Sequence, residues 1–64
     1  MLKIVKNTKK IMILEDEHHK DTWLNVCLCD DGIYIDKAYM SCEPAMPPDV
    51  AVKFAEKILG WCKK

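Results

Sequence analysis

The four cysteines are the residues of this sequence that could most readily bind a metal ion or react. Cys27 and Cys29 alternate along a predicted strand, so both thiols project from one face and can reach a single ion. Together with Cys42 and Cys62 they would complete a four-thiolate zinc site. Structural zinc sites more often use C-x-x-C turns, and the other two cysteines are distant in sequence. We therefore expect no metal ion or other cofactor, and thiols that pack as small apolar side chains.

His18 and His19 are the second candidate for metal chemistry, and they could also titrate near neutral pH. They lie within residues 15–21, a run of charged residues that is typical of a polar loop. Adjacent side chains in a turn diverge, so we expect both histidines to be solvated loop residues. Asp30, Asp31 and Asp36 lack the ligand spacing of an EF-hand, and turn chemistry explains the first two.

The chain shows no pattern typical of an enzyme. Its two glycines serve local geometry, and neither belongs to a phosphate-binding loop. No spacing places a cysteine beside a histidine and a third orienting group. A chain of 64 residues also leaves little room for a concave substrate pocket. We expect a protein that is not an enzyme.

Apolar periodicity predicts the elements that position these residues. Strands are predicted for residues 11–14, 23–29 and 33–40, with a short first strand over residues 3–6 that turns at Asn7 and Thr8. Pro48 and Asp49 suit the first turn of a helix. Apolar residues then recur at helical spacing: Val50, Ala51, Phe54, Ala55, Ile58, Trp61 and Cys62. We predict one α+β domain over residues 1–64, a three- to four-stranded antiparallel sheet with one C-terminal amphipathic helix packed on one face.

The sequence Asp30-Asp31-Gly32 predicts a β-hairpin. A two-residue turn at Asp31 and Gly32 would pair Leu28 with Ile35. A three-residue turn would instead mix polar and apolar side chains on each face. We prefer the first register because register follows the buried pattern. It gives a core face interrupted only by Lys37, formed by Leu24, Val26, Leu28, Ile33, Ile35 and Tyr39.

The second face of this sheet is the basis of our functional prediction. One helix shields one face, and the open face of an antiparallel sheet is usually polar. Here it carries aromatic and sulfur side chains, which is typical of an association surface. The predicted interaction surface consists of Trp23, Asn25, Cys27, Cys29, Tyr34, Asp36 and Met40.

We therefore expect a protein-protein interaction module that forms a homodimer through this face or an edge strand and binds a protein partner. In the alternative, Trp23 and Met40 wrap round the sheet edge and cap the core of a self-contained monomer.

Charge is distributed unevenly although the net charge is zero. The first ten residues carry lysines and no acidic residue, whereas acidic residues dominate residues 15–49. Every positive charge is Lys, while specific readers of nucleic acid rely on the planar donors of Arg. The alternative function is a small nucleic-acid-binding module that uses a basic N-terminal arm of Lys3, Lys6, Lys9 and Lys10.

The start of the chain has no apolar run long enough for a signal peptide or a membrane span. We therefore expect a cytoplasmic protein with no membrane partner and with reduced thiols.

Two stretches carry a resemblance: Asp31-Gly32-Ile33-Tyr34-Ile35, and Pro48-Asp49-Val50-Ala51 with Phe54-Ala55 and Ile58-Leu59. They resemble the end of many small phage and prophage accessory proteins, in which a hairpin strand, a short loop and an Ala-rich helix follow one another. The resemblance covers about half of the chain. It implies a small protein-binding or regulatory factor and transfers no site residues.

Overall fold

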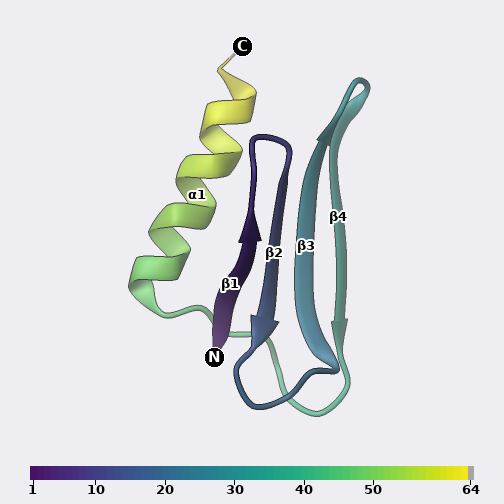
Figure 1. Ribbon diagram of the computed structural model, residues 1–64, viewed down its shortest axis with the longest axis vertical. Coiled ribbons are helices and arrows are strands. Elements are labelled where there is room, and N and C mark those ends of the chain that lie inside the picture. Colours follow the sequence, from purple (N-terminus) through teal and green to yellow (C-terminus); the bar gives the residue numbers. More distant parts are fainter. Residues whose placement is uncertain (64) are drawn as a thin grey trace.

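The computed structural model describes residues 1–63 and shows an α+β fold. The strands β1 (Leu2–Asn7), β2 (Ile11–Asp16), β3 (Thr22–Cys29) and β4 (Gly32–Tyr39) form one antiparallel sheet in the order β1-β2-β3-β4. The helix α1 (Pro48–Cys62) follows and lies alongside β1, at the opposite side of the molecule from β4 (Figure 1). This confirms the predicted fold class, with four strands and one C-terminal helix.

The strands begin and end slightly differently from the prediction. β2 continues to Asp16, so Glu15 and Asp16 belong to the sheet and not to the following loop. The turn between β1 and β2 spans residues 8–10, where the Thr8 hydroxyl accepts a hydrogen bond from the Ile11 amide at 3.2 Å. This side-chain bond supports the chain reversal because it supplies an acceptor for an amide at the start of the strand.

The hairpin register differs from both predicted registers. Asp30 and Asp31 form the turn, and Gly32 pairs with Cys29 as the first residue of β4. Leu28 therefore lies opposite Ile33 and not Ile35. Gly32 has a φ of 155°, which side-chain-bearing residues rarely adopt, so the glycine is needed at the start of the strand. The register shift is two residues, and each side chain of the hairpin stays on its predicted face.

The core lies between α1 and the strands β1, β2 and β3. Its buried side chains come from three strands and the helix: Leu2, Met12, Leu14, Val26, Val50 and Trp61. Half-buried apolar residues surround them: Ile4, Leu24, Leu28, Ile33, Met46, Phe54 and Ile58. The core is small, as expected for a domain of 64 residues, which buries a modest share of its surface.

Four residues predicted to face the core are exposed: Ile35, Tyr39, Ala55 and Cys62. Ile35 and Tyr39 lie on the predicted side of β4 but are 64% and 52% exposed, because α1 runs beside β1 and does not reach β4. Cys62 was predicted to face the core, and it is exposed at the end of α1, where Trp61 occupies the buried position. For the two residues of β4, the cause is the position of the helix at the other side of the sheet.

Helix α1 begins as the sequence predicts. Pro47 is the N-cap, Pro48 starts the helix, and Asp49 lies in the first turn, where a negative charge is favourable. At the other end, the Lys63 amide donates a hydrogen bond to the Leu59 carbonyl at 3.1 Å. Within residues 1–63, no helix has the length and apolar character needed to cross a bilayer.

Candidate functional site

The face of the sheet that points away from the core is the first candidate site, and we call it the open face. Residues paired across antiparallel strands share a face, so the register defines its members. On β3 and β4 they are Trp23, Asn25, Cys27, Cys29, Tyr34, Asp36 and Ala38. Met40, the remaining residue of the predicted surface, lies beyond the end of β4 and is 81% exposed.

Strand β2 adds two isoleucines that the sequence did not assign to this face. Ile11 pairs with Cys27, and Ile13 pairs with Asn25, so both isoleucines project from the open face. Four consecutive apolar residues, 11–14, show no alternation, and sequence reasoning therefore had no signal for which pair pointed outward. The open face is consequently more apolar than predicted, and its apolar character continues across β2, β3 and β4.

A shallow groove of about 530 Å³ crosses the open face. Half-buried Ile11, Ile13 and Cys27 and exposed Tyr34 line it, together with Asn25 and Asp36. Val26 and Ile35 also border the groove, although their side chains project from the other face of the sheet. Helix α1 packs against the other side of the sheet and does not cover it. Trp23 is half-buried beside Glu15 on the same face, and Met40 does not cap the core.

Asn25, Cys27 and Cys29 place an amide and two thiols on the open face. The Asn25 Oδ1 atom is buried and has no hydrogen-bond partner. The thiols of Cys27 and Cys29 lie 3.9 Å apart, and this contact is the main cause that raises the pKa of Cys29. Cys29 is therefore a protonated thiol at neutral pH, which is a poor nucleophile.

A second group of polar side chains surrounds Asp16 at the end of β2. The Asp16 Oδ2 atom accepts hydrogen bonds from the amides of His18 and His19 at 2.9 and 3.0 Å, and from the His19 ring at 3.1 Å. The Met1 amine lies 3.0 Å from Oδ1. The His18 amide and then the Met1 ammonium hold the pKa of this carboxyl well below its ordinary range, although burial opposes them.

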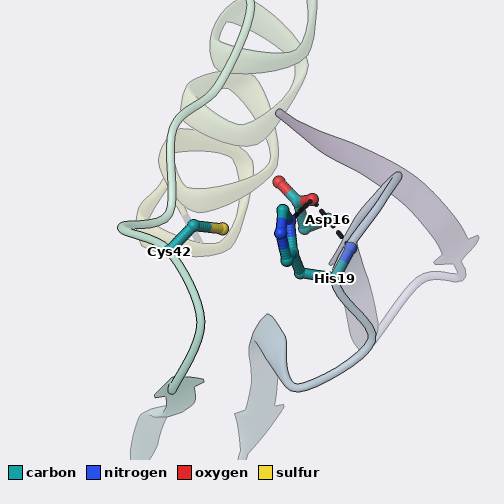
Figure 2. Close-up of side chains that lie close together, drawn as sticks. All are labelled: Asp16, His19 and Cys42. Atoms are coloured by element: carbon teal, nitrogen blue, oxygen red, sulfur yellow. Dashed lines mark hydrogen bonds and ion pairs between the residues drawn. The ribbon is translucent and has the colours of Figure 1, made fainter.

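Cys42 lies next to Asp16 and His19, and the three residues form a cluster from three chain segments (Figure 2). Their ligand atoms all lie within 4.8 Å of one another. Both histidines are exposed loop residues, as predicted, but the His19 ring also bonds to Asp16, whereas His18 is 76% exposed. Within residues 1–63 the four cysteines do not gather, because Cys27 and Cys29 lie on the open face and Cys62 on the helix.

The four N-terminal lysines lie on β1 and in the following turn. Lys3 pairs with Glu15 and Lys6 with Ile13, which places both on the open face, while Lys9 and Lys10 are exposed in the turn. Lys3 and Lys6 belong to the sheet, and Lys9 and Lys10 belong to the turn that follows, so the four lysines do not form a free arm. The Lys57 Nζ of α1 donates a hydrogen bond to the Thr8 carbonyl at 2.6 Å, which adds a helix lysine beside this turn.

Comparison of the chain with protein-family models, with curated proteins and with solved structures found no match. The class that the structure defines is an α+β domain with a four-stranded antiparallel sheet and one C-terminal helix.

Proposed function

We propose that this protein is a non-enzymatic interaction module that forms a homodimer through the open face and, in that form, binds a protein partner. The observation that carries the proposal is the apolar surface of Ile11, Ile13, Trp23 and Tyr34 around a groove on the side of the sheet away from α1. Two such faces would pack as in a β-sandwich, about 10 Å apart. In this proposal the protein is a small cytoplasmic regulatory or accessory factor, as its resemblance to phage accessory proteins implies.

The small size of the domain supports a second copy as the occupant. A chain of 64 residues with a core of this size gains little stability from its own folding, and association commonly supplies the rest. A two-fold axis brings the same patch from both copies together, so an apolar patch is its own complement. Lys6 and Asp36 lie at opposite sides of this surface and can pair across the two-fold axis.

The solution mass tests the proposal through two adjacent residues of β4. Tyr34 projects from the open face and Ile35 from the other face, and both are more than half exposed, so neither substitution removes a core residue. We expect the wild type to be a dimer by light scattering at micromolar concentration. Tyr34→Lys lowers the dimer fraction at least tenfold, whereas Ile35→Lys leaves it unchanged.

The other outcomes contradict the proposal in distinguishable ways. A strictly monomeric wild type at high micromolar concentration removes the homodimer. Loss of the dimer in Ile35→Lys, with or without loss in Tyr34→Lys, moves the contact from the open face to the free edge of β4, because exposed edges can pair with another chain.

Nucleic-acid binding is the second candidate function, and one observation favours it. The hydrogen bond from Lys57 to Thr8 brings a helix lysine to the turn that holds Lys9 and Lys10. This candidate requires binding to duplex DNA that weakens steeply with salt. The combined change of Lys3, Lys6, Lys9 and Lys10 to Gln would abolish it, and absence of binding at low salt would retire it.

A further inference from the structure

Three different metal-ligand types converge at one end of the sheet. Asp16 ends β2, His19 lies in the loop before β3, and Cys42 lies in the segment between β4 and α1. Figure 2 shows the Cys42 sulfur directed toward the His19 ring and the Asp16 carboxylate. A carboxylate, an imidazole and a thiol are the donors that zinc takes from proteins.

The separations of these ligand atoms are close to those of a tetrahedral site. Zinc-ligand bonds of about 2.0–2.3 Å place neighbouring ligand atoms about 3.3–3.6 Å apart. His19 Nδ1 and Asp16 Oδ2 are 3.1 Å apart, and all three ligand atoms lie within 4.8 Å. The Cys42 sulfur needs to approach by roughly 1 Å, and its segment, residues 40–47, has no regular secondary structure that would resist this.

Hydrogen bonds from surrounding groups already orient two of the three ligands. The Asp16 side chain is 4% exposed and is held by the His18 and His19 amides. The buried Thr22 hydroxyl donates to the Cys42 carbonyl at 3.3 Å and accepts from the Cys42 thiol at 3.5 Å. Partners of this kind fix ligand orientation in metal sites. The His19 side chain is 44% exposed, which leaves a path for the ion and room for a water ligand.

We propose that Asp16, His19 and Cys42 bind a zinc ion, with a water molecule as the fourth ligand. The Cys42 thiol releases its proton to solvent on binding, and the thiolate and the Asp16 carboxylate together balance the two positive charges. Neutral His19 gives up its hydrogen bond to Asp16, moves its proton from Nδ1 to Nε2, and binds the ion through Nδ1. This site lies at the end of the sheet and does not depend on the proposed homodimer.

Metal binding would join segments that are distant in the sequence. The segment of Cys42 leads from β4 to α1, and it is attached to β1 by the hydrogen bond from the Leu2 amide to the Ala45 carbonyl at 2.7 Å. A zinc ion would add an attachment to the end of β2, besides the hydrogen bonds between Thr22 and Cys42. Metals commonly stabilise domains of this size, because a ligand that binds only the folded state raises its stability. We therefore expect zinc to raise the unfolding temperature.

Cobalt titration of the reduced, chelator-treated protein tests the site directly. Cys27→Ser/Cys29→Ser serves as the reference protein, because the thiols of Cys27 and Cys29 lie 3.9 Å apart and could bind metal themselves. We expect one Co²⁺ per chain, with a thiolate-to-cobalt charge-transfer band in the near ultraviolet that one equivalent of Zn²⁺ removes. The same reference protein unfolds at a higher temperature with Zn²⁺ than with chelator.

Two matched pairs of variants in that background assign the ligands. Cys42→Ser abolishes the charge-transfer band and Cys62→Ser retains it. His19→Gln weakens the affinity for Co²⁺ at least tenfold, whereas His18→Gln, which changes the exposed neighbour, does not. Circular dichroism confirms that each variant is folded, and Asp16 is left intact because its carboxylate also supports the fold. Absence of one-to-one binding, a band that survives Cys42→Ser, or equal affinities of the two histidine variants would overturn the assignment.

Discussion

The indole Nε1 of Trp61 donates a hydrogen bond to the main-chain carbonyl oxygen of Lys9 at 2.8 Å. This bond connects the last turn of α1 to the turn between β1 and β2, across 52 positions of the chain. The ring itself is 8% exposed and is part of the core. One side chain therefore both fills the core and orients the helix along β1.

Two substitutions separate these roles of Trp61. Trp61→Phe keeps an aromatic ring in the core but removes the donor, and we expect it to lower the free energy of unfolding by about 1 kcal/mol. Trp61→Ala also empties the core and costs about 3–5 kcal/mol, which is comparable to the whole stability of so small a domain. Urea unfolding followed by circular dichroism measures both, and equal effects of Phe and Ala would contradict the packing role.

The two glycines are expected to respond in opposite directions to the same change. Gly32 has a φ of 155°, so Gly32→Ala places a side chain in a strained conformation and costs about 1–3 kcal/mol. Gly60 lies in α1 with nothing within 4 Å of an added Cβ, so Gly60→Ala stabilises the helix by about 0.5–1 kcal/mol. Thermal unfolding of the two variants measures both effects. If the Gly32→Ala variant unfolds at or above the wild-type temperature, the expected strain is absent because the turn has relaxed.

From the environment of Asp16 we predict that the protein loses stability in acid. Its folded-state pKa lies below the ordinary value of 3.8, so its carboxylate is bound more favourably in the folded state than in the unfolded state. A group of this kind stabilises the fold above its unfolded pKa, and the stabilisation is lost as the pH falls through the folded pKa. In metal-free protein we expect the unfolding temperature to fall below about pH 4. Asp16→Asn, which cannot ionise, should be less stable at neutral pH and should lose less stability on acidification.

We predict that a substitution of Asn25 on the open face stabilises the protein. Its buried Oδ1 lacks a hydrogen-bond partner, and an unsatisfied buried acceptor costs about 1–3 kcal/mol. Asn25→Leu has a similar shape and removes the polar atom, so the free energy of unfolding should rise by about 1 kcal/mol at protein concentrations where the monomer prevails. Asn7→Leu, at the exposed end of β1, is the control and should change stability by less than about 0.5 kcal/mol. A less stable Asn25→Leu would mean that the amide is satisfied in solution.

Local signals in the sequence were sufficient to predict the strands and the helix, and the side of the sheet on which most side chains lie. Alternation along β3 and β4 assigned residues such as Trp23 and Tyr34 to the open face, because successive side chains of a strand point to opposite sides. Pro48 and Asp49 marked the start of α1 through helix-end chemistry, which depends on neighbouring residues alone. These signals do not require any knowledge of distant contacts.

The tertiary structure decided the features that depend on how separate elements meet. The position of α1 beside β1 left Ile35 exposed, although its place in the strand pattern predicted burial. The faces of Ile11 and Ile13 followed from pairing with β3, since a continuous apolar run has no period of its own. The cluster of Asp16, His19 and Cys42 arises because two loops meet at one end of the sheet, and the path of a loop is set by the elements that it connects rather than by its own residues.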